Sequence, residues 1–109
     1  MRTLNKEELK FIANRVNDSR ARAKDKKIAH DITKHDVAQM YMQSGGRCPY
    51  IKVPFVLEKG SRYNISLDRI DSSKGYTKDN IMIICDWANK AKGTCTPEEF
   101  LELCERVAS

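Results

Sequence analysis

The stretch ISLDRIDSSKGYTKDNIMIICDWANKAK, residues 65–92, decides the fold of this chain. Apolar and polar residues alternate over 64–70, which predicts a β-strand. The DSSKG segment that follows predicts a turn, because its Gly75 supplies the backbone freedom that a tight reversal needs. A second apolar run at 81–84 predicts another short strand, and residues 86–92 fit a helix that a glycine ends. The predicted order is therefore strand, turn, strand and helix.

Two helices are predicted before this central unit. Apolar residues recur at helical spacing from Asn5 to about Lys24, which predicts the first helix. The capping-box pattern TKHD at 33–36 predicts the start of the second helix, which the paired glycines at 45–46 end. Two prolines interrupt the apolar segment 47–55, so a short hairpin or an irregular strand is expected there.

A further helix is predicted at the C-terminal end of the chain. The pattern TPEE at 96–99 combines a threonine N-cap, a proline in the first turn and a capping-box glutamate. Helical spacing then predicts that Phe100, Leu103 or Cys104, and Val107 face the core. Helices at both ends of a strand–turn–strand unit indicate an α+β fold.

Length and composition indicate one domain with a single modest core in a chain of 109 residues. We divide it into a helical, basic part at 1–45, the central unit at 46–93 and the C-terminal helix at 94–109. No apolar run approaches the roughly 20 residues that span a bilayer, and the opening MRTLNKEELK holds no apolar signal core. A cytoplasmic protein without membrane contact is therefore expected.

Charge is distributed unevenly along the chain, whose formal net charge is +5. Residues 20–27 hold five basic side chains and one aspartate, whereas the part from Gly93 onward holds four glutamates and one arginine. A basic segment of this kind indicates a face that meets a polyanion, and nucleic acid is the expected partner. The alternative is a solvated helix that is merely rich in lysine.

The cysteines do not have the spacing of a zinc site. They stand at positions 48, 85, 95 and 104 and include no Cys-x-x-Cys pair. We interpret them as small buried apolar residues or free thiols in a reducing compartment, and no structural zinc is expected.

A different metal is expected at the central unit. Asp68 lies near the end of the first predicted strand, and Asn89 lies on the helix that folds back on it. A carboxylate and an amide oxygen with open positions suit Mg²⁺ or Mn²⁺, which keep water ligands and take phosphate oxygens. Such an ion would stabilise charge on a phosphate that is being cleaved.

At these residues the chain resembles the HNH endonucleases, the ββα-metal or His-Me finger family. The family pattern is roughly Asp-His, an Asn about a dozen residues later and a final His or Asn. Here Asp68-Arg69 is followed by Asn80 eleven residues after Arg69 and by Asn89 nine residues further on. The flanking GYTKDN and ANKAK, and GGRCPYIKVPF upstream, are similar to small phage HNH proteins, in which LDRID recurs. The resemblance covers nearly the whole chain, although its information is concentrated in 46–92.

The resemblance implies roles for individual residues. Asp68 and Asn89 would be metal ligands, Asn80 would brace the loop and help to orient the catalytic group, and Arg69 would stand at the catalytic position. The alternatives are that Asp68 caps the turn with Asp71, that Asn80 starts a helix and that Asn89 is a surface amide. Basic residues are expected to contact DNA; they are Arg15, Arg20, Arg22, Lys24, Lys26, Lys27, Lys90 and Lys92. Lys90 and Lys92 would meet backbone phosphates, and the basic segment 15–27 would either follow the phosphates or enter a groove.

Arg69 stands where the family has the histidine that removes a proton from the attacking water. A guanidinium is no ordinary base at neutral pH, but it can hold a phosphate and stabilise charge in the transition state. His30, His35, Asp71 and Tyr76 are the other candidate bases, and each has a structural interpretation that fits its position better. Bulk water acting on a metal-bound water is a further alternative. The sequence leaves the general base open.

Two functions follow from the resemblance. The first is a Mg²⁺- or Mn²⁺-dependent endonuclease of a bacterial or phage-infected cell that nicks or cuts DNA. The second is a catalytically silent HNH-fold protein that only binds DNA, which the absent histidine favours. The sequence leaves open the target sequence, nicking against double-strand cleavage, DNA against RNA, the biological role and whether the protein is a monomer or a dimer.

Overall fold

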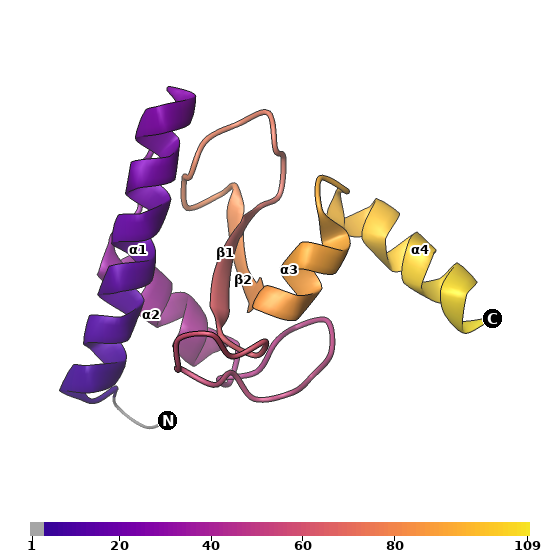
Figure 1. The fold of residues 1–109 in the computed structure, drawn as a ribbon, viewed down its shortest axis with the longest axis horizontal. Helices are drawn as coiled ribbons and strands as arrows, with labels where there is room; N and C mark the ends of the chain where they lie inside the picture. Colours follow the sequence, from indigo (N-terminus) through magenta and orange to yellow (C-terminus); the bar gives the residue numbers. More distant parts are fainter. Residues whose placement is uncertain (1–3) are drawn as a thin grey trace.

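The computed structural model describes residues 4–109, which form four helices and one two-stranded antiparallel sheet (Figure 1). The elements, in chain order, are α1 (Lys6–Lys26), α2 (Lys34–Gln43), β1 (Ile65–Arg69), β2 (Ile81–Cys85), α3 (Asp86–Lys92) and α4 (Pro97–Ala108). The predicted α+β class is confirmed, and the predicted helices and strands occur in the predicted order.

The central unit is a hairpin that runs directly into a helix. β1 pairs with β2 along its whole length, and Cys85, the last residue of β2, is also the N-cap of α3. The amide N–H groups of Asp86 and Trp87 donate to the carbonyl oxygens of Asn64 (3.0 Å) and Arg62 (2.9 Å). These bonds satisfy donors that the first turn of a helix leaves free. They also fix α3 against the segment that leads into β1.

The core lies between the sheet and the first two helices. In Figure 1, α1 and α2 lie on one side of the hairpin and α3 lies on the other. The fully buried side chains between them include Ile12, Val16, Val37, Ile65 and Ile84. Apolar residues from four different elements therefore share one core, and it holds the hairpin in place.

Side-chain caps set the start of three helices. Asn5, Thr33 and Thr96 each accept a hydrogen bond from the amide of the third helical residue, whose acidic side chain bonds back to the cap. The capping boxes predicted at 33–36 and 96–99 are thus confirmed. Within residues 4–109, no helix has both the length and the apolar character needed to cross a membrane.

The segment between α2 and β1 is irregular. A single isolated bridge joins Arg47 to Pro54, so one bridged pair of residues is what forms of the short hairpin or irregular strand expected at 47–55. The two prolines explain this, because proline has no N–H group to donate to a strand ladder.

The cysteines occupy different environments. Cys48 and Cys85 are buried, and the backbone N–H of Cys85 lies 3.5 Å from the Cys48 sulfur. Cys95 is half-buried and Cys104 is exposed, and all four thiols are free. The interpretation as small apolar core residues is correct for the buried pair.

α4 projects away from the other elements (Figure 1). Phe100 is buried and meets the ring of Tyr50 edge-on, with ring centroids 5.0 Å apart. Leu103 is 47% exposed and Val107 is 78% exposed, and Cys104 is exposed as well. The prediction that these three face the core is wrong, because helical spacing marks an apolar face without providing a surface that covers it.

Candidate functional site

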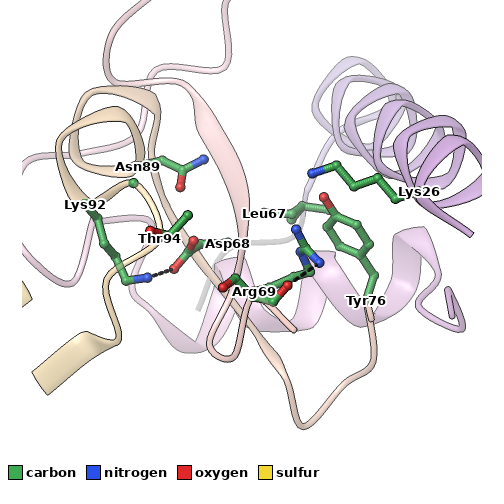
Figure 2. A pocket seen from close by; sticks show the side chains of 10 residues that line it. Lys26, Leu67, Asp68, Arg69, Tyr76, Asn89, Lys92 and Thr94 are labelled. Carbon is green, nitrogen blue, oxygen red and sulfur yellow. Dashed lines mark hydrogen bonds and ion pairs between the residues drawn. The ribbon is translucent and has the colours of Figure 1, made fainter. Parts of the chain in front are cut away.

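One cleft brings the central predicted residues together (Figure 2). It has a volume of about 220 Å³ and lies between β1, α3, the turn after β1 and the end of α1. Asp68 and Arg69 reach it from β1, Asn89 and Lys92 from α3, and Lys26 from α1. Residues separated by more than sixty positions in the sequence therefore line the same space.

Side chains on one face of β1 meet side chains on one face of α3. Ser66 and Asp68 are two residues apart in the strand, so they point to the same side of the sheet. Asn89 and Lys92 are three residues apart in the helix and share one helix face. The Asn89 Nδ2 group donates to Ser66 Oγ at 2.6 Å, and Lys92 Nζ lies 2.9 Å from Asp68 Oδ2. The strand and the helix are thus joined by two parallel side-chain pairs.

The pair formed by Asp68 and Lys92 is a buried ion pair. The side chain of Asp68 is 7% exposed and that of Lys92 is 1% exposed. Burial raises the pKa of the Asp68 carboxyl above its ordinary value, while Lys92 and Arg69 act in the opposite direction. The Lys92 ammonium also donates to the carbonyl oxygen of Cys95. The expected phosphate contact of Lys92 therefore does not fit its position, because its charge is turned inward onto Asp68.

The donor set of the cleft suits a hard divalent cation on one condition. Asp68 offers carboxylate oxygens, and Asn89 keeps its amide oxygen because its nitrogen is the atom that bonds to Ser66. Lys92, however, already places a positive charge at Asp68. Among residues 4–109, no three His, Cys, Asp or Glu side chains gather as a metal-binding group. Asp68 and Asn89 therefore fit Mg²⁺ or Mn²⁺ only if the Lys92 ammonium moves away from Asp68.

Arg69 holds the turn that follows β1. Its Nη1 donates to the carbonyl oxygens of Ser72 (2.9 Å) and Lys74 (3.0 Å). Its guanidinium carbon also lies 5.4 Å from the ring centroid of Tyr76, within the range of a cation–π contact. The guanidinium lines the cleft and braces the turn at the same time.

Asn80 braces the same turn from the other end. Its Oδ1 accepts from the backbone N–H of Asp71 at 3.0 Å. Its Nδ2 donates to the carbonyl oxygens of Asp71 (3.1 Å) and Gly75 (2.8 Å). Asn80 thus braces the turn by three bonds, while its expected part in orienting a catalytic group stays a prediction. Asn80 is not among the residues that line the cleft, so it acts on the site through the turn.

The two histidines lie outside the lining of the cleft. His30 Nε2 lies 2.8 Å from Ser19 Oγ. Since that hydroxyl donates to the carbonyl oxygen of Val16, the ring nitrogen is the donor. Burial, followed by the charge of Arg20, lowers the pKa of His30. His35 is an exposed residue of α2.

The other two candidate bases lie in the turn after β1 or directly after it. Asp71 accepts from the hydroxyl of Ser73 at 2.6 Å and from its N–H at 2.9 Å, and these bonds lower the pKa of Asp71. The expected self-capping of the turn is confirmed. Tyr76 is buried and lines the cleft, with its hydroxyl 3.5 Å from Nε of Arg22.

The residues expected to contact DNA differ in their exposure. Arg15 is turned inward: Nε donates to the carbonyl oxygen of Ile65 at 2.9 Å, and Nη2 lies 3.2 Å from an Asp86 oxygen. Arg15 thus ties α1 to the start of both β1 and α3. The remaining basic residues, apart from Lys92, are exposed on α1, at its C-cap or on α3; they are Arg20, Arg22, Lys24, Lys26, Lys27 and Lys90.

No family model, curated protein or solved structure matches this chain. Sequence reasoning missed Ser66, and it assigned Lys92 to DNA phosphates instead of to Asp68. The spacing shows only which side chains share a face, because Ser-x-Asp in a strand and Asn-x-x-Lys in a helix each place two polar side chains together. It does not show that these two faces meet each other.

Proposed function

We propose that this protein is an HNH-type endonuclease with a ββα-metal core that hydrolyses phosphodiester bonds of DNA. It would use Mg²⁺ or Mn²⁺ in the cytoplasm of a bacterial or phage-infected cell. The observation that carries the proposal is the convergence of Asp68, Arg69 and Asn89 in one cleft beside Lys26. Hard oxygen donors next to cationic side chains are the chemistry that a phosphodiester requires.

Each residue of the cleft would have a separate role in binding a scissile phosphate. Asp68 and Asn89 would hold the cation through a carboxylate and an amide oxygen. When bound, the ion stabilises charge on the phosphate and on the departing oxygen. Lys26 lies at the cleft and offers a charge-assisted hydrogen bond to a phosphate oxygen.

Arg69 supports the reaction by electrostatics and not as a base. Its Nη1 is committed to the carbonyl oxygens of the turn, so its remaining N–H groups are those that would bind a phosphate. Because no histidine lines the cleft, we expect turnover slower than that of an enzyme with a general base by about 10² to 10⁴.

A second function, that of a catalytically silent DNA-binding protein, is favoured by one specific observation. Lys92 already neutralises Asp68 at 2.9 Å, so the carboxylate has a structural partner without any metal. In this case the exposed basic residues at the end of α1 would supply salt-sensitive binding through phosphate contacts.

Cleavage of supercoiled plasmid with Mg²⁺ or Mn²⁺ separates the two functions. Asp68→Ala and Asn89→Ala are expected to abolish nicking, whereas Glu105→Ala, which removes an exposed carboxylate on α4, should cleave like the parent. Circular dichroism must show that each variant is folded. Absence of cleavage by the parent, with salt-sensitive DNA binding retained, would overturn the nuclease in favour of the silent protein.

A further inference from the structure

A second cleft lies on α3 and is distinct from the one that holds Asp68. It has a volume of about 340 Å³ and is lined by Trp87 and Lys90 of α3 together with the segment Gly60, Ser61 and Arg62. Asp86 also lines it, but its carboxylate is paired with Arg15 at 3.2 Å, so Arg62 and Lys90 leave the cleft cationic. The volume lies at the lower end of that of small-ligand sites, about 300–1,000 Å³.

Trp87 is an exposed aromatic side chain held in a fixed place. Trp87 is 50% exposed, while its backbone N–H donates to the carbonyl oxygen of Arg62 at 2.9 Å. The Arg62 guanidinium carbon lies 4.6 Å from the indole centroid, and the Tyr63 ring meets the indole edge-on at 6.1 Å. With Arg62 over one face and Tyr63 at the edge, the exposed area belongs to the other part of the ring. An indole that is held in place and half-exposed beside two cationic side chains offers a flat surface on which another ring can stack.

The chemistry of this cleft defines the ligand. An ordered indole stacks on the face of a nucleobase, while arginine and lysine contact backbone phosphates. Base faces are hidden in a duplex, so the ligand must present an unpaired base. We infer that the cleft beside Trp87 binds an unpaired base and its adjoining phosphate from single-stranded nucleic acid.

The position of the cleft connects it with the proposed reaction. α3 carries Trp87 and Lys90 to this cleft and Asn89 and Lys92 to the cleft of Asp68, so a strand that crosses α3 reaches both. The inference thereby names single-stranded or locally opened nucleic acid as the substrate class. It rests on the proposed function only for the claim that the bound strand continues into the cleft of Asp68.

Trp87 is the single tryptophan of the chain, so its fluorescence reports on this cleft alone. The full chain in EDTA is titrated with a short oligothymidylate, with an abasic oligonucleotide of equal length and charge, and with a blunt duplex. Quenching is expected from oligothymidylate and not from the other two. Equal quenching by the abasic strand, or no quenching by any strand, would overturn the inference, because charge alone would then account for binding.

A labelled oligothymidylate provides the second measurement, by fluorescence anisotropy. Trp87→Ala is expected to weaken binding by about 10-fold to 100-fold, as loss of one stacked base does, and Trp87→Phe should retain part of the affinity. Leu101→Ala is the matched control, since Leu101 is also 50% exposed but lies on α4; its affinity should equal that of the parent. Parent-like affinity of Trp87→Ala would refute the inference.

These binding assays use no divalent ion, so they are independent of cleavage. If Trp87 binds the base and the parent cleaves no DNA, the stacking site stands and the proposed nuclease fails. If the parent cleaves plasmid but its Trp87 variants bind oligothymidylate unchanged, the nuclease stands and this inference fails.

Discussion

Replacement of Lys92 by methionine tests the buried ion pair at the centre of the candidate site. Methionine keeps an unbranched side chain in place but removes the ammonium that lies 2.9 Å from Asp68 Oδ2. Both side chains are at most 7% exposed, so water compensates the lost interaction only in part. Removal of one partner of such a pair costs about 3–5 kcal/mol, because the other charge remains buried without compensation.

Urea denaturation followed by circular dichroism measures this cost. With an m value of about 1.5 kcal/mol/M, the midpoint of Lys92→Met should fall by about 2–3 M. The double variant Asp68→Asn, Lys92→Met removes both charges and should recover most of the loss. Lys90→Met is the matched control, because this exposed lysine lies two residues earlier on the same helix; its midpoint should match the parent. A double variant no more stable than Lys92→Met would refute the assignment of the cost to Asp68.

The same variant tests the competition between Lys92 and a divalent ion. Mn²⁺ is expected to stabilise Lys92→Met much more than the parent, by about 2.7 kcal/mol at a concentration of 100 times its Kd. The reason is that the ion then meets an unpaired carboxylate. Addition of Asp68→Asn should abolish the effect. Equal stabilisation of the parent and of Lys92→Met by Mn²⁺ would show that Lys92 does not occupy the cation position.

Three further predictions concern the surroundings of the site. Burial lowers the pKa of His30 in the folded protein, so as the pH falls the unfolded chain protonates this histidine first. The contribution of His30 to stability should therefore be fully present above about pH 6.5 and be lost as the pH falls through the pKa of the folded state. Urea midpoints measured from neutral to acidic pH should show a shallower decline for His30→Gln, and equal slopes would contradict this. Asn80→Ala should lower the free energy of unfolding by about 1–4 kcal/mol, since three hydrogen bonds to the turn are lost; a loss smaller than 0.5 kcal/mol by the same assay would count against the bracing role. Arg69→Lys should lower the free energy of unfolding by about 1–2 kcal/mol, because an ammonium cannot reproduce the flat contact with Tyr76 while bonding to two carbonyl oxygens. A melting temperature equal to that of the parent would contradict this.

The central unit could be predicted because its signals are local. Alternation over 64–70, the apolar run at 81–84 and the glycine after residue 92 each report on a few neighbouring residues. The exposure of α4 could not be predicted in this way. Its apolar spacing is as regular as that of a core helix, and only the direction in which the chain leaves α3 decides that Val107 meets solvent.

In the candidate site, too, some features follow from local sequence signals and others depend on the tertiary fold. Asp68 and Asn89 line one cleft because the hairpin folds its helix back on the first strand, which the order of elements already implies. The inward turn of Lys92 and Arg15 could not be read from their neighbours, because a lysine or arginine on a helix is usually solvated. Each is drawn inward by a carboxylate from a part of the chain that only the tertiary fold brings near: Asp68 for Lys92 and Asp86 for Arg15.

The contact between the turn after β1 and the segment before α2 has an evolutionary consequence. The backbone N–H of Tyr76 donates to the carbonyl oxygen of Ala29 at 2.9 Å, and a Cβ atom on Gly75 would overlap that same oxygen. Arg69 is held by the carbonyl oxygen of Lys74, the residue next to Gly75. A larger side chain at position 75 would therefore displace an acceptor of Arg69 unless the segment before α2 moved as well. In a relative that lacks this glycine, the turn and the segment before α2 should therefore have changed together. Covariation between these two segments would show that the position of the N-terminal helices is coupled to the shape of the cleft.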